Sequence, residues 1–78
     1  MAKLTGAACR AGRGLLKWSM RDLAKASQVS LPTILKLEND GAVSQTTVDK
    51  IRSAFDDAGV EITNGKGTGV RLRSSLRR

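Results

Sequence analysis

Residues 18–39 read WSMRDLAKASQVSLPTILKLEN, and this stretch decides the fold. Its first part contains Ser19 followed three residues later by Asp22, a variant of the capping box that marks helix starts. We therefore predict a helix from about residue 20 to residue 26, with Leu23 facing the core. The next three residues are left for a short turn.

A second helix is predicted directly after that turn. Ser30 is a suitable N-cap, and Pro32 lies in the first turn, where its missing N–H costs no hydrogen bond. Ile34 and Leu37 face inward at helical spacing, and residues 39–41 (Asn-Asp-Gly) supply the turn chemistry that ends the helix. Two short helices joined in this way form a helix-turn-helix, whose second helix can enter a major groove about 12 Å wide.

Two further helices flank this pair. Thr5 is a candidate N-cap for the first, and Gly12 and Gly14 weaken that helix unless they mark close packing. Ser44 is a candidate N-cap for the last, and Gly59 is placed to end it. The apolar residues expected to face inward are Ala7, Ala8, Ala11 and Leu15 in the first helix and Val48, Ile51, Phe55 and Ala58 in the last.

The spacing of apolar residues changes from 3.6 to 2 after residue 59. Alternation at residues 60–63 and 70–73 predicts two strands, and the glycine-rich residues 64–69 connect them. An isolated two-stranded hairpin is marginal in water, so it has to pack on the helices or on another chain. The fold class is therefore mainly α, with four helices (domain 1–58), a short C-terminal β-hairpin (59–73) and a basic disordered tail (74–78).

The charge of the chain favours a polyanionic partner. Fourteen Lys and Arg against seven Asp and Glu give a net charge of +7 on 78 residues. Residues 1–36 hold seven bases and one acid, residues 37–64 two bases and six acids, and residues 65–78 five bases. The pattern predicts one face for nucleic acid or an acidic membrane surface and another for solvent or a protein partner.

Several classes of chemistry are excluded by composition. The chain has no histidine and one cysteine, so it cannot build an internal disulfide, a one-chain zinc site or a histidine-dependent catalytic centre. The run Gly65-Lys66-Gly67 lacks the Ser or Thr of a phosphate-binding loop, and the adjacent Asp56 and Asp57 point to different sides of a helix. We expect no enzyme, no cofactor and no metal.

Cys9 is expected to be a small buried residue and Trp18 a packing residue.

The location is predicted from what the sequence does not contain. No apolar run approaches the roughly 20 residues that span a bilayer. Residues 1–10 hold no apolar stretch suited to a secretory signal. We therefore expect a cytoplasmic binding module.

The segments WSMRDLA (18–24), VSLPTI (29–34) and LEN (37–39) together resemble the Cro/CI-type (XRE) helix-turn-helix domain. The resemblance covers about residues 4–58, or four of the family's usual five helices. The ending, AGVEI (58–62) through GVRLR (69–73), is similar to that of small bacterial and mobile-element members. The resemblance therefore implies a bacterial protein that is nucleoid-associated when bound. The resemblance implies a lambda-repressor-like fold and a sequence-specific, double-stranded DNA-binding transcriptional regulator, either repressor or activator or both.

The resemblance also implies roles for individual residues. Residues 30–36 correspond to the recognition helix, and Gln28 stands at the turn position where the family usually has glycine. Arg13 and Glu38 fall where the family often has a structural ion pair between the first and third helices. Base contacts are expected from Leu31, Pro32, Thr33 and Lys36, and phosphate contacts from Lys17, Ser19, Met20, Arg21, Ser30, Asn39, Gln45 and Thr46.

The same residues also have explanations that involve no contact with DNA. The residues expected to contact phosphate can equally form an ordinary solvated surface. Leu31 and Leu35 can equally shield the core rather than face a base.

Such a domain contacts about half an operator, so we expect a homodimer on an inverted repeat with half-sites about 34–36 Å apart. The candidate dimerisation element is the strand pair, because a free strand edge invites pairing with its twin. Its apolar residues are Val60, Ile62, Val70 and Leu72. Alternatively, Arg71, Arg73, Arg77 and Arg78 lie along DNA phosphates.

Three other functions remain open from the sequence. An antitoxin would use the strands or the acidic fourth helix to hold a toxin. An antiactivator is the other possible protein partner. An architectural DNA binder would not discriminate between base sequences. A membrane-surface protein is the least favoured, because the bases do not line one long amphipathic helix.

Overall fold

The computed structural model describes residues 4–65 and 67–72. The predicted fold class is confirmed, because four helices are followed by an antiparallel strand pair. The predicted tail at residues 74–78 lies outside the described residues. The elements are α1 (Gly6–Leu16), α2 (Met20–Ser27), α3 (Leu31–Glu38), α4 (Gln45–Asp57), β1 (Val60–Gly65) and β2 (Gly67–Leu72).

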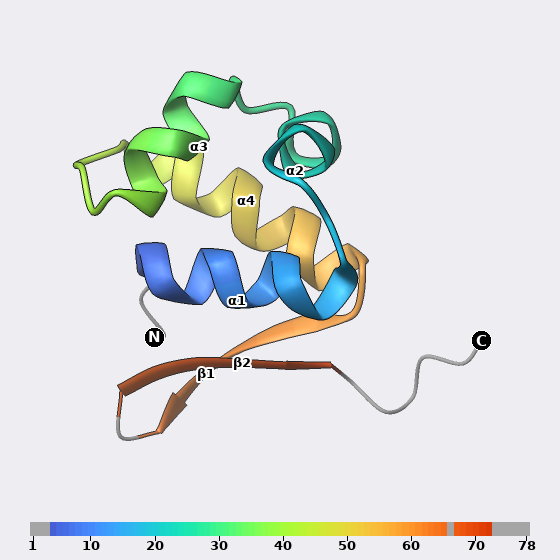
Figure 1. Cartoon of the computed structure of the whole chain (residues 1–78). Coiled ribbons are helices and arrows are strands. Elements are labelled where there is room, and N and C mark those ends of the chain that lie inside the picture. Colours follow the sequence, from blue (N-terminus) through green and yellow to red (C-terminus); the bar gives the residue numbers. More distant parts are fainter. Residues whose placement is uncertain (1–3, 66, 73–78) are drawn as a thin grey trace.

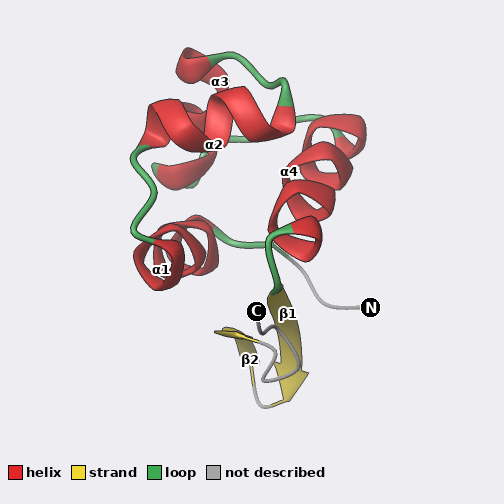
Figure 2. Cartoon of the chain, turned by 90° about the vertical axis from the view of Figure 1, so that its right-hand side faces the viewer, coloured by secondary structure: helices red, strands yellow, loops and turns green. Residues whose placement is uncertain are grey.

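The elements form three levels. Figures 1 and 2 both place α2 and α3 on one side of the molecule and the hairpin on the opposite side, with α1 and α4 between them. In the hairpin, β2 packs along α1, and β1 contacts both α1 and α4. The sequence predicted that the hairpin packs either on the helices or on another chain, and in the structure it packs on the chain's own helices. Within the part of the chain that the structure describes, no helix has the length and apolarity needed to cross a membrane.

Each helix begins at its predicted N-cap. The side-chain oxygens of Thr5, Ser19, Ser30 and Ser44 each accept a hydrogen bond from the backbone N–H three residues later. The capping box at α2 is reciprocal, because Ser19 N–H donates to Asp22 Oδ2 at 2.8 Å while Asp22 N–H donates to Ser19 Oγ at 3.0 Å. These bonds satisfy N–H groups that have no partner inside the helix. Helix starts are thus set by local sequence.

The helix ends depend on residues in the left-handed region. Gln28 has φ 59°, as expected from the family's glycine at this position, and the strain costs about 1 kcal/mol. Gly59, at φ 91°, follows α4 as predicted. Asp40 (φ 64°) lies in the turn predicted to end α3, whereas the left-handed Lys17 (φ 58°) at the end of α1 was not indicated by the sequence. These positive φ angles let each short helix turn sharply into the next.

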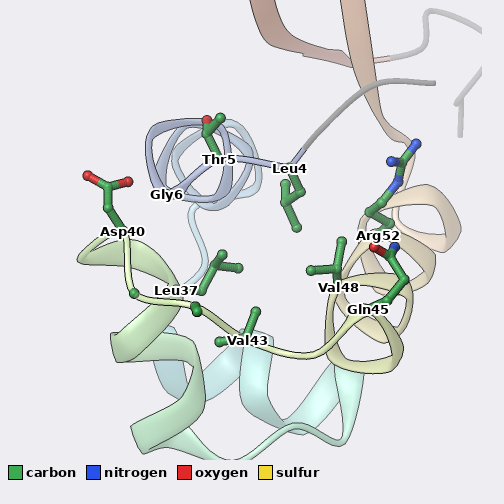
Figure 3. Close-up of a pocket in the computed structure, with 11 residues that line it drawn as sticks. Leu4, Thr5, Gly6, Leu37, Asp40, Val43, Gln45, Val48 and Arg52 are labelled. Atoms are coloured by element: carbon green, nitrogen blue, oxygen red, sulfur yellow. The ribbon is translucent and has the colours of Figure 1, made fainter.

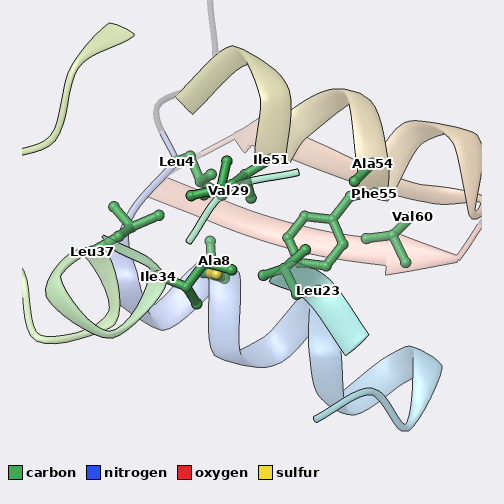
Figure 4. Packing of buried hydrophobic residues seen from close by; sticks show 11 residues of the cluster. Leu4, Ala8, Leu23, Val29, Ile34, Leu37, Ile51, Ala54, Phe55 and Val60 are labelled. Carbon is green, nitrogen blue, oxygen red and sulfur yellow. The ribbon is translucent and has the colours of Figure 1, made fainter. Parts of the chain in front are cut away.

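The core lies where the inner faces of the four helices meet (Figure 4). Leu23, Ile34, Ile51 and Phe55 are fully buried there, one or two from each of α2, α3 and α4. Trp18 stacks on Phe55 with the ring centroids 6.1 Å apart, so it is a packing residue. The core therefore joins the helix-turn-helix to α4, and the Trp18–Phe55 pair adds the linker before α2 to the same cluster.

The inward face predicted for α1 is partly wrong. Ala7, Ala11 and Leu15 are exposed, whereas Ala8, Cys9 and Gly12 are buried. Apolar spacing misplaced the face because alanine and glycine contribute too little apolar area to choose a side of the helix. What chooses it is Gly12, whose missing side chain lets the Phe55 ring lie against the α1 backbone.

The hairpin differs from the prediction in two respects. The strands extend through most of the glycine-rich connector, with Val60 opposite Leu72 and Gly65 opposite Gly67. Val60 is 1% exposed and belongs to the helical core, so it offers almost no surface to a second copy, and its role in dimerisation stays a prediction. The reason is that β1 starts directly after α4, which carries its first side chain under the helices.

Two glycines of α1 give a matched stability test. A Cβ on Gly12 would lie 2.9 Å from the Phe55 ring, whereas a Cβ on Gly14 would meet nothing within 4 Å. We expect Gly14→Ala to raise the free energy of unfolding by about 0.5–1 kcal/mol through helix propensity. We expect Gly12→Ala to lower it by about 1–2 kcal/mol, because overpacking outweighs the same gain. Denaturant unfolding followed by circular dichroism measures both, and equal effects would contradict this packing.

Candidate nucleic-acid interface

The recognition-helix candidate α3 has one buried side and one exposed side. Ile34, Leu37 and Glu38 are buried at 5% exposure or less. Leu35 is 47% exposed, so it does not shield the core, while Leu31 is half-buried. Of the residues expected to contact bases, Pro32 and Lys36 are exposed and Leu31 and Thr33 are half-buried. The structure therefore brings these four side chains to the accessible part of one short helix.

The residues expected to contact phosphate are also accessible. Most of them lie at or beside the starts of α2, α3 and α4, where backbone N–H groups carry partial positive charge. The Gln45 amide already donates to Asp49 Oδ1 at 2.9 Å within α4, and Ser30 Oγ is 2.8 Å from Thr33 Oγ1. The exposed members are Lys17, Ser19, Arg21, Ser30, Asn39, Gln45 and Thr46, and Met20 is half-buried.

The carboxylate of Glu38 joins α1 to the end of α3. Arg13 donates twice to it, from Nε to Oε2 at 2.7 Å and from Nη2 to Oε1 at 2.8 Å. The third nitrogen of Arg13 donates to the backbone carbonyl of Trp18 at 3.1 Å. The Arg13–Glu38 ion pair that the resemblance implied is thus present, and it also reaches the linker before α2.

Two more donors to Glu38 were missed by sequence reasoning. The Cys9 thiol donates to Glu38 Oε2 at 3.3 Å, and Arg10 Nη1 donates to the backbone carbonyl of Glu38. Cys9 and Arg13 lie one turn apart on the same face of α1, while Arg10 follows Cys9 on the neighbouring, exposed flank of the helix. The i, i+4 spacing of Cys9 and Arg13 could be seen in the sequence, but nothing in the sequence indicated that Glu38 would be the acid to which they donate.

The titration of Glu38 is governed by two opposing effects. Burial of the carboxyl raises the pKa of Glu38, but the hydrogen bonds from Arg13 and then Cys9 outweigh it, so the pKa lies below its ordinary value. Burial, followed by the bond to Glu38, raises the pKa of the Cys9 thiol to about 12. The thiol therefore stays protonated at neutral pH, as a donor and not as a reactive thiolate.

A hollow of about 680 Å³ lies beside the end of α3 (Figure 3). It opens between the start of α1, the loop after α3 and the first half of α4. Its apolar lining comes from Leu4, Leu37, Val43 and Val48, and its polar lining includes Asp40, Gln45 and Arg52. In residues 4–65 and 67–72, no group of three or more Cys, Asp or Glu side chains is placed to hold a metal ion.

The basic residues of the C-terminal segment lie away from α3. Arg71 Nε donates to Glu61 Oε1 at 2.7 Å across the exposed face of the hairpin, on the side of the molecule opposite α3. Arg73, Arg77 and Arg78, which were also considered for phosphates, lie outside the described residues. The hairpin arginine that the structure describes is thus engaged within the chain.

Comparison with known proteins identifies one relationship. A family model described as helix-turn-helix matches residues 10–56. The matched span runs from within α1 almost to the end of α4, so it contains every helix of the candidate interface. A search of curated proteins found no match.

The buried ion pair predicts a specific response to acid. A carboxyl whose pKa is lowered by folding stabilises the protein above its unfolded pKa of about 4.3, and this stability is lost as pH falls through the folded pKa. We expect Glu38→Gln to lower the free energy of unfolding at pH 7 by about 2–4 kcal/mol, because Arg13 loses its charge partner. The variant should also show a shallower loss of stability between about pH 5 and pH 3.

The exposed Glu61–Arg71 pair is the control for this change, because its nitrogen–oxygen distance is the same 2.7 Å. We expect Glu61→Gln to cost about 0.5 kcal/mol or less at pH 7, since solvent screens the pair. Urea unfolding at several pH values measures both variants. Equal losses in the two variants would show that burial of the Glu38 pair is energetically irrelevant.

Proposed function

The chain belongs to the Cro/CI-type (XRE) helix-turn-helix family of DNA-binding regulators, and from this membership we propose that it is a sequence-specific transcriptional regulator of double-stranded DNA. The observation that carries the proposal is the two-sided α3. Its inner side is buried and bound to α1, while its outer side holds the amine of Lys36, the hydroxyl of Thr33 and three apolar side chains within reach of solvent. A rigid helix with such an accessible face of donors and apolar groups is what reading of a major groove requires.

We propose that Lys36 reads guanine. A lysine can donate to guanine O6 or N7, and Lys36 is exposed in the last turn of α3. Its stem is guided by Gly41, because a Cβ at position 41 would lie 2.6 Å from Lys36 Cγ. Thr33 can contact a base or a phosphate, and Leu31 and Pro32 suit a thymine methyl group.

The phosphate contacts we propose come from the helix starts. At α2, the exposed Lys17 and Arg21 flank the N-terminus that begins at Ser19 and Met20. At α4, Gln45 and Thr46 offer a second N-terminus, and Ser30 and Asn39 lie at the two ends of α3. Such contacts fix the position of the protein on the duplex without reading its sequence.

Replacement of the base-reading residues tests the proposal. We expect Lys36→Ala, and separately Thr33→Ala, to weaken binding to the operator about tenfold to hundredfold while leaving non-specific binding nearly unchanged. The assay is footprinting on the DNA upstream of the protein's own gene, with random DNA as competitor. Arg71→Ala is the matched control, because Arg71 lies on the side opposite α3 and should not change the affinity. Equal competition by random and operator DNA in the wild type would indicate an architectural binder instead.

We propose that the protein acts as a homodimer on an inverted repeat. The hairpin offers Leu72, which is 45% exposed, and the remaining accessible surface of Ile62 and Val70, which pack partly against the chain's own core. Leu15, at 41% exposed, lies near the end of α1, and β2 packs along this helix. Because the hairpin is opposite α3, two copies have to meet side by side for both recognition helices to face one duplex.

A charge introduced at Leu72 tests this interface. We expect Leu72→Arg to weaken self-association at least tenfold in sedimentation equilibrium, because a cation would have to be desolvated between two copies. Binding to a single half-site should stay unchanged, while binding to the full inverted repeat should become weaker. Ser53→Arg, at an exposed position of α4, is the control. Undiminished association of the Leu72 variant would place the dimer interface elsewhere.

A further inference from the structure

We propose that Cys9 and Arg10 are positioning residues for base reading, which they support by holding Glu38 and with it the last turn of α3. This inference rests on the proposed function, in which α3 reads the operator. Neither residue touches the outer face of α3; both act through Glu38 from the opposite side. The Arg13–Glu38 pair alone does not account for the contact, because two further donors converge on the same residue.

The contact consists of hydrogen bonds that three residues of α1 donate to Glu38, the last residue of α3. The Cys9 thiol and the Arg13 guanidinium both donate to Glu38 Oε2, at 3.3 Å and 2.7 Å. Arg10 donates to the Glu38 backbone carbonyl, one of the carbonyls that no N–H of α3 satisfies and that carry the negative end of the helix dipole. Side chain and main chain of Glu38 are therefore held separately, which restricts both the rotation and the translation of α3.

Gly6 makes this approach possible. A Cβ at position 6 would lie 2.7 Å from the Leu37 carbonyl oxygen and 2.8 Å from the Glu38 carbonyl oxygen. The start of α1 therefore lies directly against the last carbonyls of α3, without a side chain between them. At this distance the two helices cannot shift independently. We call this contact between Gly6, Cys9 and Arg10 of α1 and the last residues of α3, Leu37 and Glu38, the joint.

The joint lies within one turn of the residue proposed to read guanine. Lys36 is two positions before Glu38, and its carbonyl accepts hydrogen bonds from the N–H groups of Asn39 and Gly41 at 3.2 Å and 2.8 Å. A base-edge hydrogen bond tolerates only a few tenths of an ångström, whereas a phosphate contact tolerates more because it depends on charge. A loosened joint should therefore weaken specific binding more than non-specific binding.

The Cys9 thiol is suited to a permanent positioning role. It is fully buried, and burial keeps it protonated, so the S–H donor remains across the physiological pH range. Its partner is an ionised carboxylate, and bonds of this charge-assisted kind are stronger than neutral ones. Serine offers the same donor in a slightly smaller side chain, whereas alanine offers none.

The test compares discrimination rather than affinity alone. Titrations of operator DNA and random DNA give the ratio of the two dissociation constants for wild type, Cys9→Ala, Cys9→Ser and Arg10→Met, at a temperature where circular dichroism shows each variant folded. We expect the ratio to fall about tenfold in Cys9→Ala and in Arg10→Met, and to stay within about twofold of wild type in Cys9→Ser. Val60→Ala, a core change at the hairpin, should lower stability without changing the ratio.

Each outcome decides the matter. An unchanged ratio in Cys9→Ala and Arg10→Met, in a wild type that does discriminate, would overturn the positioning role and leave the proposed function standing. A wild type that fails to discriminate would overturn the proposed function itself. A ratio that falls equally in Val60→Ala would show that general stability is responsible. If Cys9→Ala does not fold, Arg10→Met still decides, because Arg10 is exposed and its replacement leaves the core intact.

Discussion

The buried carboxylate of Glu38, the last residue of α3, is the electrostatic constraint that joins α3 to α1. A carboxylate at 4% exposure is costly to desolvate, and it is tolerated only because donors surround it. All of these donors come from α1, so the charge of Glu38 is compensated only when α3 is in its place against α1. Arg13 extends the arrangement to the Trp18 carbonyl, just before the capping box of α2. One ion thus fixes the helix that is proposed to read bases and the helix start that is proposed to bind phosphate.

Close packing around Phe55 supplies the complementary apolar constraint. The ring lies against Gly12 of α1 and stacks on Trp18, so α4 packs on both α1 and the linker that follows it. Val60 extends this core to the first residue of β1. The hairpin therefore shares one core with the helices, although it lies on the side of the molecule opposite α3. A domain this small has little surplus stability, which makes each of these contacts count.

The separation of surfaces follows from the same arrangement. The accessible side of α3 holds Pro32, Leu35 and Lys36, whereas the exposed apolar side chain Leu72 belongs to the hairpin on the opposite side of the molecule. DNA and a second copy would therefore not compete for one surface. Arg71 is held by Glu61 on the hairpin, so the positive charge of the described hairpin is locally compensated. This compensation favours contact between like-charged copies there over contact with phosphate.

The sequence by itself determined the helix starts, the tight turn, the strand pair and the family, because caps, proline, glycine and alternation act over three or four residues. It also indicated the Arg13–Glu38 pair, through the resemblance rather than through any local rule. Only the tertiary structure decided which side of α1 is buried, since Ala7, Ala8 and Ala11 differ too little in apolar area to choose. The same holds for Cys9 and Arg10, whose partner lies 28 or 29 residues away, and for Val60, which is drawn into the core by its position after α4. These features depend on which surfaces meet, and that is settled by packing of the whole chain rather than by neighbours in sequence.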